Sequence, residues 1–231
     1  MNYTQLEKSF FKSFLLFSIV VLLFVNIFFT LNSSKYRINQ IIIQSNGYLT
    51  NNLVIPNSIY KTSIWLVSEN NFQELVLSEP SIEKVNIKKN YPNSLYVEII
   101  EVSSLVNILD LRGSTPKTKV LLKNLIEIDS GIALPISNLT ITNGPLPRGF
   151  NGEIVSMIET LKSYYFSMEE FSFTYDGDNL IGFYRGSNIY FGKAVDLGTK
   201  ASALGSLLGN QACTGDFRFI TSEDIISNCE Y

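Results

Sequence analysis

The sequence predicts an α+β protein. It has a single N-terminal transmembrane helix, then a small domain of strand–helix–helix–strand–strand (β-α-α-β-β) order, and then a mostly antiparallel β domain with two helices. Three observations predict this architecture. Residues 14–31 are almost wholly apolar, residues 38–102 combine alternating apolar runs with one helical run, and residues 103–220 are mainly short alternating runs between turn-forming residues. Strands and helices that do not alternate regularly along the chain are typical of the α+β class.

Composition limits the function. The chain has 231 residues, 45% of them apolar, and a formal net charge of -3. This weakly acidic balance argues against a nucleic-acid partner, because phosphate binding needs a basic field. The sequence contains no histidine, so the commonest general base and metal ligand at neutral pH is missing. We therefore expect no catalytic residue, no metal and no cofactor, although catalysis by carboxylates alone stays open.

The apolar run "FLLFSIVVLLFVNIFFTL" extends from Phe14 to Leu31 and contains no charged residue. Eighteen helical residues span roughly 27 Å, which is close to the hydrocarbon thickness of a bilayer. A cleaved signal peptide is the alternative. However, the apolar core of a signal peptide is usually shorter, and no A-x-A-like cleavage site follows here. We expect residues 14–31 to be an uncleaved, single-pass anchor.

The basic residues that flank the anchor do not decide its orientation. Lys8 and Lys12 precede the anchor, and Lys35 and Arg37 follow it, so the positive-inside rule is nearly tied. A short leader crosses a membrane less readily than a secreted domain does. We therefore expect residues 1–13 to form a cytoplasmic leader and the bulk of the chain to be extracytoplasmic.

The small domain, residues 38–102, is predicted to begin with a strand in which Ile41 and Ile43 lie on one side. A short helical piece or turn follows and is cut by Pro56. A longer helix comes next in "SENNFQELVLSEP", where polar residues from Ser68 onward supply capping candidates and a proline ends the helix. Three residues at helical spacing form its apolar face: Phe72, Leu75 and Val76.

Two alternating runs on either side of "YPNS" predict a β-hairpin. The residues predicted to face the core are Val85, Ile87, Leu95, Val97 and Ile99. Tyr96 and Ile100 are apolar but point outward. They are either a contact surface for another chain or ordinary surface residues that pack on the next domain.

In the second domain, "LVNILDLRG" and "KVLLKNLIEID" predict strands, and "FSFTY" and "LIGFY" around an Asp-Gly turn predict a hairpin. One helix is predicted to be capped by Asn151 and a second helix to cover residues 197–208. The apolar residues of the first helix are Ile154, Ile158, Leu161 and Tyr165. "GDFRFI" is the predicted final strand, which leaves residues 221–231 as a C-terminal tail. The only cysteines, Cys213 and Cys229, could form a disulfide or remain thiols, and the sequence leaves both open.

No catalytic motif has its required context. Ser81 and Lys84 match the S-x-x-K pattern, but the segment follows a proline and is predicted as a strand, which places the two side chains on opposite faces. The acidic turn that begins at Asp176 lacks an oxygen ligand at its fifth position, where Leu180 stands, so a hairpin turn explains it better than a calcium loop.

Several segments, in their order along the chain, resemble one family. The run "INQIIIQSNGYLT … SIWLVSENNFQELVLSEPSIEKVNIKKNYPNSLYVEIIE" is similar to the POTRA domain of the bacterial cell-division protein family FtsQ, called DivIB in Gram-positive lineages. The family pattern appears at ten positions: Ile41, Ile43, Leu75, Pro80, Ile82, Val85, Tyr91, Pro92, Leu95 and Glu101. "NIYFGKAVDLGTKASALGSLL" and "GDFRF" resemble parts of the family's second domain. Two departures are that Asn46-Gly47 reverses the usual Gly-Asn, and that residues 105–151 match poorly.

The resemblance implies a non-enzymatic scaffold of the divisome. Such a protein crosses the plasma (inner) membrane once, is enriched at the division septum, and holds FtsB- and FtsL-type coiled-coil partners that regulate septal peptidoglycan synthesis. In the family, a partner segment adds alongside a late strand of the second domain. Carried over, the partner-binding residues are Asp216, Phe217, Arg218, Phe219 and Ile220. We expect charge reversal at Arg218, or proline at Phe217, to abolish co-purification of the partner while folding persists.

Two alternatives remain. The protein could be a membrane-anchored POTRA chaperone or secretion component that holds β-strands of client proteins. It could also be an envelope enzyme that uses carboxylates. Septal localisation separates the first alternative from a division scaffold, and activity on cell-wall fragments would support the second.

Overall fold

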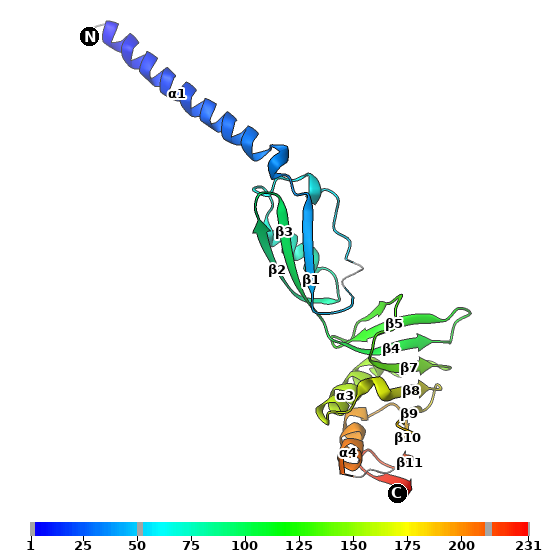
Figure 1. The fold of residues 1–231 in the computed structure, drawn as a ribbon. Coiled ribbons are helices and arrows are strands. Elements are labelled where there is room, and N and C mark those ends of the chain that lie inside the picture. Colours follow the sequence, from blue (N-terminus) through cyan, green and yellow to red (C-terminus); the bar gives the residue numbers. More distant parts are fainter. Residues whose placement is uncertain (1–2, 50–52, 211–213, 231) are drawn as a thin grey trace. The chain divides into compact units, whose positions relative to one another are not determined.

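The structure is a computed structural model that describes residues 3–49, 53–210 and 214–230. The chain divides into two compact units. The first comprises Met1–Asn46 and Thr50–Glu101, and the second comprises Gly47–Leu49 and Val102–Tyr231. Figure 1 shows the succession of elements along the chain.

The first unit opens with helix α1, Tyr3–Leu31. Its portion Phe11–Leu31 is long and apolar enough to cross a membrane and is not covered by other parts of the described chain. The helix begins well before Phe14, where the apolar run starts, because the polar residues ahead of that run are also compatible with a helix. One candidate membrane span therefore precedes the first domain.

The predicted strand–helix–helix–strand–strand order is confirmed, with a single 3₁₀ turn as the short helix. Its elements are β1 (Gln40–Ser45), η3 (Ile59–Lys61), α2 (Glu69–Leu77), β2 (Ile82–Asn90) and β3 (Ser94–Glu101). A further 3₁₀ turn, η1 (Ser34–Tyr36), precedes β1. The sheet order is β1-β3-β2, with β1 parallel and β2 antiparallel to the central strand β3.

Helix α2 packs on one face of this sheet because its apolar stripe meets the inward residues of the hairpin. Ser68 caps the helix by accepting a hydrogen bond from the Asn71 amide at 3.3 Å, as predicted. Phe72 and Val76 are buried, but Leu75 is 44% exposed, so the apolar face is narrower than predicted. The inward hairpin residues are all buried as expected: Val85, Ile87, Leu95, Val97 and Ile99.

Strand β1 keeps Ile41 and Ile43 on one side, as predicted, but the two side chains differ in burial. Ile41 packs on the core, whereas Ile43 is 38% exposed. Strand β1 lies at the edge of the three-stranded sheet. An isoleucine on an edge strand can therefore keep β-structure without full burial.

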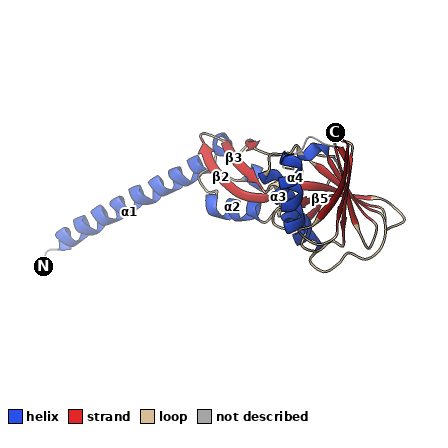
Figure 2. Cartoon of the chain, turned by 90° about the horizontal axis from the view of Figure 1, so that it is seen from below, coloured by secondary structure: helices blue, strands red, loops and turns tan. Residues whose placement is uncertain are grey.

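The second unit is a nine-stranded sheet with two helices against one face (Figure 2). The strand order is β12-β11-β10-β9-β8-β7-β4-β5-β6, and the pairs are mostly antiparallel, as predicted. The first strands are β4 (Ser104–Asp110), β5 (Lys117–Leu122), β6 (Glu127–Asp129) and β7 (Ser137–Ile141). The later strands are β8 (Phe171–Tyr175), β9 (Leu180–Tyr184), β10 (Ser187–Gly192), β11 (Thr214–Phe219) and β12 (Ile225–Glu230).

The helices are α3 (Phe150–Ser163) and α4 (Leu197–Asn210), and a 3₁₀ turn, η4 (Met168–Glu170), precedes β8. The predicted cap Asn151 is wrong. The cap is Gly149, in a left-handed conformation and two residues earlier, so helix α3 starts at Phe150 and Asn151 lies in its first turn. Tyr165 follows the end of the helix and is 97% exposed, so the predicted apolar stripe ends at Leu161.

Helix α4 lies very close to α3 because glycines remove side chains at their contact. A Cβ on Gly205 would come within 2.4 Å of the Tyr164 ring. The segment between β10 and α4 is fixed by the buried Lys200, whose Nζ donates to the carbonyl oxygens of Phe191 at 2.8 Å and Lys193 at 2.9 Å. Burial lowers the pKa of this amine. The hydrogen bonds of Lys200 therefore fix α4 to the end of β10, the strand beside β11.

Candidate partner-binding edge

The last two strands of the sheet form the candidate site. Strand β11 pairs in parallel with β10 on one side and antiparallel with β12 on the other. The predicted edge position of residues 216–220 is therefore wrong, and "GDFRFI" is not the final strand. Strand β12 follows it and, within the described ranges, has a strand on one side only. The outer side of β12 is thus the sheet edge at this end.

The hydrogen-bond phase of β12 identifies which backbone groups face that edge. The amide of Ile220 donates to the carbonyl oxygen of Asp224 at 3.0 Å, so this opposed pair is hydrogen-bonded. Opposed pairs in an antiparallel ladder alternate between hydrogen-bonded and non-hydrogen-bonded. The pair Phe217–Ser227 comes three pairs after Ile220–Asp224, so it is a non-hydrogen-bonded pair. The N–H and C=O of Ser227 therefore point away from β11, toward the open side.

The side chains of β11 alternate between the two faces of the sheet. Phe217 is fully buried in the core beneath the helices, and Phe219 stacks on Phe191 with ring centroids 5.4 Å apart. Asp216 and Arg218 are exposed on the opposite face. Of the predicted binding residues, the two phenylalanines therefore hold the strand in place, while Asp216 and Arg218 are accessible.

The exposed charges are held by neighbours on β10. Asn188 Nδ2 donates to Asp216 Oδ1 at 2.9 Å. The Arg218 guanidinium lies 5.1 Å from the centre of the Tyr190 ring, within the range of a cation–π contact. The contact leaves the guanidinium accessible, so it could still receive a carboxylate.

Two exposed isoleucines extend this surface toward the edge. Ile226 on β12 stands opposite Arg218 and is 56% exposed, and Ile220 just after β11 is 64% exposed. Register places Arg218 and Ile226 on the same face. The candidate site therefore combines an accessible cation, exposed apolar side chains and outward-facing backbone groups.

A turn between β11 and β12 is the local sequence signal for the last strand. Thr221 and Asp224 close a tight turn: Thr221 Oγ1 donates to Asp224 Oδ2 at 2.9 Å and accepts from the Asp224 amide at 3.0 Å. Thr and Asp three residues apart after a strand favour such a reversal. The choice between a disulfide and two thiols, which the sequence leaves open, falls on Cys213, and this residue lies outside the described residues.

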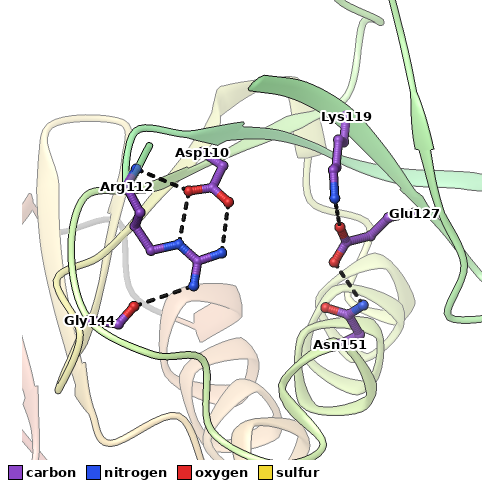
Figure 3. Close-up of polar contacts among 6 residues, drawn as sticks. All are labelled: Asp110, Arg112, Lys119, Glu127, Gly144 and Asn151. Atoms are coloured by element: carbon purple, nitrogen blue, oxygen red, sulfur yellow. Dashed lines mark hydrogen bonds and ion pairs between the residues drawn. The ribbon is translucent and has the colours of Figure 1, made fainter. Parts of the chain in front are cut away.

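Polar side chains near the other end of the sheet form two closed clusters (Figure 3). Arg112 pairs with both carboxylate oxygens of Asp110, at 2.8 and 2.7 Å, and donates to the Gly144 carbonyl at 3.3 Å. The hydrogen bonds from Arg112 lower the pKa of Asp110 to about 2. The guanidinium of Arg112 therefore donates to groups of the protein itself. These hydrogen bonds join β4 to the loop after β7.

The second cluster joins β5, β6 and α3. Glu127 accepts from Lys119 Nζ at 2.7 Å and from Asn151 Nδ2 at 3.0 Å. Burial raises the pKa of Glu127, but these two donors outweigh burial and leave the pKa below its usual value. Among the residues described, no three acidic or cysteine side chains gather as metal ligands. In the same part of the chain, no buried side-chain nitrogen or oxygen lacks a hydrogen-bond partner.

Comparison with known protein families identifies the first domain. Residues 36–101 match the family model described as the POTRA domain, FtsQ-type. The matched segment contains β1, α2 and the β2–β3 hairpin. The resemblance to the FtsQ/DivIB family is thereby confirmed for this domain, and the match is consistent with a protein of that family. No curated protein matches the chain.

Proposed function

We propose that this chain, whose residues 36–101 form an FtsQ-type POTRA domain, is a scaffold protein of the bacterial divisome. It binds FtsB- and FtsL-type partners and links them to septal peptidoglycan synthesis. The FtsQ-type POTRA family is a non-catalytic scaffold family that acts in cell division through protein–protein interactions. We extend that non-catalytic role to the whole chain.

The observation that carries the proposal is the FtsQ-type match directly after a candidate membrane span. A scaffold of this kind is anchored by α1 in the plasma membrane with its N-terminus in the cytoplasm. The POTRA domain and the nine-stranded sheet then lie outside the cytoplasm, at the division septum. Partners reach the sheet from the same compartment.

The partner adds a strand to the outer side of β12. Outward N–H and C=O groups, such as those of Ser227, pair with the incoming backbone, and nearby side chains select the sequence. Arg218 receives a partner carboxylate, and Ile226 offers apolar contact beside it. In this proposal the exposed residues of β11 contact the partner through their side chains on the face of the sheet. The backbone hydrogen bonds to the partner are made by β12 instead of β11.

The experiment is capture of FtsB- and FtsL-type partners by the tagged full chain carrying Ser227→Pro. The Ser227 amide faces away from β11, so proline at this edge position removes an outward donor without removing a ladder bond. One lost hydrogen bond weakens binding by about 0.5–1.5 kcal/mol, which is about 2- to 13-fold, and the ring also obstructs the incoming strand. Ser227→Ala is the matched control and should bind like the wild type.

A fluorescent fusion tests the cellular role in the same strains. Septal signal and failed division after depletion support the proposal. Uniform envelope signal with normal division would instead favour the POTRA chaperone alternative. If folded Ser227→Pro protein captures the partners at wild-type level, strand addition at β12 is refuted.

A further inference from the structure

One end of the POTRA domain carries an exposed group of large side chains. The Trp65 ring lies 6.0 Å from the Tyr36 ring and 4.5 Å from the Tyr91 ring, measured between centroids. Trp65 is 46% exposed, Tyr91 50% and the adjacent Leu66 59%. We call Tyr36, Trp65, Leu66 and Tyr91 the aromatic end. Contiguous aromatic and aliphatic surface of this kind does not stabilise a domain in water and is typical of an interaction site.

The aromatic end lies where the chain leaves α1. Tyr36 follows Leu31, the last residue of α1, by five positions, which an extended chain covers in at most about 18 Å. The segment that carries Trp65 is tied to the same place. The Ile64 amide donates to the Tyr36 carbonyl at 2.8 Å, and the Ser63 hydroxyl donates to the Leu31 carbonyl.

Sheet topology brings Tyr91 to this end as well. Strands β1 and β3 are parallel, so both begin at the end where the chain enters the domain. The Asn39 amide donates to the Asn93 carbonyl at 3.0 Å, which joins the start of β1 to the hairpin turn. Tyr91 lies in that turn and therefore beside the chain entry.

The segment that carries Tyr36, Trp65 and Leu66 has charges of one sign, and the first acidic residue after it, Glu69, pairs with Lys89 at 3.9 Å. Residues 32–68 contain three basic residues, Lys35, Arg37 and Lys61, and no acidic residue. All three side chains are exposed, and Lys35 Nζ lies 5.8 Å from the centre of the Tyr36 ring. Aromatic rings mixed with exposed lysine and arginine are the composition found at the boundary between lipid and water.

We propose that the aromatic end binds the phospholipid headgroup layer of the membrane that α1 spans. Trp65, Leu66 and Tyr91 enter the interfacial layer, and the basic side chains contact anionic phosphates. The proposal rests on the membrane anchoring proposed above. Its consequence is that the POTRA domain is held to the bilayer by its own surface as well as by the short segment after α1.

The test uses Trp65 itself, because it is the only tryptophan in the chain. The full chain is reconstituted into phosphatidylcholine vesicles with and without phosphatidylglycerol. Tryptophan emission is then quenched either by aqueous iodide or by phospholipids that carry a spin label near the headgroup or deep in the acyl chain. The control is the double variant Trp65→Phe/Tyr165→Trp, because Tyr165 is 97% exposed in the other unit.

We expect the shallow spin label to quench Trp65 severalfold more than the deep label does. We expect iodide to quench it severalfold less than it quenches the tryptophan at position 165. Phosphatidylglycerol should strengthen the shallow quenching, and Lys35→Gln/Lys61→Gln should remove that increase. The comparison of vesicles with and without phosphatidylglycerol separates the two modes of binding. Quenching through a headgroup contact depends on the anionic lipid, whereas quenching through purely apolar insertion does not.

Three results would overturn the inference. Strong iodide quenching without lipid quenching would show that Trp65 is in water. Protection from iodide without lipid quenching would show that protein, such as a second copy of the chain, covers the aromatic end. Failure of the wild-type chain to float with vesicles after an alkaline wash would refute the anchoring itself, and the lipid contact with it.

Discussion

Truncation of Phe217 separates two explanations for any loss of binding at β11. The side chain is fully buried in the main core beneath α3 and α4. Phe217→Ala removes a whole ring from a site bounded by packed strands and helices, so the free energy of unfolding should fall by about 3–5 kcal/mol. That is a large fraction of the roughly 5–15 kcal/mol that stabilises a typical domain.

The matched variant is Arg218→Glu at the next position. Arg218 is exposed, and its contact with the Tyr190 ring contributes about 0.5–1 kcal/mol at such a site. We expect this variant to keep nearly the whole free energy of unfolding. It should nevertheless lose partner capture, because a glutamate repels the partner carboxylate that the arginine is proposed to receive.

Urea unfolding followed by far-ultraviolet circular dichroism measures the first quantity, and co-purification with the FtsB- and FtsL-type partners measures the second. Full capture by Phe217→Ala with an unchanged urea midpoint would refute the assignment of this side chain to the core. Proline at Phe217 is not a clean test of binding, contrary to the expectation from sequence. The Phe217 amide points toward β10, so proline there removes a ladder bond inside the sheet.

Two further predictions concern stability of the nine-stranded unit. Gly144 has φ +71, and a Cβ there would lie 2.5 Å from the Cα of Gly177, whereas Gly149 has φ +79 and open space around it. Gly149→Ala should therefore lower the free energy of unfolding by only about 1–2 kcal/mol for its left-handed backbone, and Gly144→Ala by clearly more; equal shifts in thermal midpoint would contradict the close approach. The pKa of Asp110 is lowered to about 2 by Arg112, so its contribution is present above the unfolded pKa near 3.9 and is lost as pH falls toward 2. Between about pH 5 and pH 3, urea unfolding should show a loss of roughly 1 kcal/mol that Asp110→Asn lacks, and identical pH profiles would contradict this.

The POTRA domain could be predicted from sequence because its periodic patterns agree with its burial. Alternation in the hairpin places Val97 inside, and the serine cap and the following proline bracket α2 as expected. The exceptions lie where an element is only partly covered. Ile43 stands on an edge strand and Leu75 on the rim of a short helix, and both are apolar without being buried.

The errors in the second unit have local causes. Asn151 was predicted as a cap because asparagine favours that position, but Gly149 adopts the left-handed conformation and starts the helix earlier. Asn151 instead donates to Glu127 on β6, a contact between segments 24 residues apart that no local pattern contains. Tyr165 continues the helical spacing of its predecessors, although the chain has already left the helix there.

The sequence pattern does not predict strand β12, because both faces of this strand are partly solvated. A strand that is partly solvated on both faces needs no strict alternation, and "IISNCE" has none: Ile226 is exposed on the same strand that places Ile225 against the core. An edge that is to receive another strand must keep its backbone groups accessible and must not be sealed by packing of its own. The open side of β12 follows from the strand order, because among the described residues only β11 pairs with it, and such an unpaired edge is what strand addition requires.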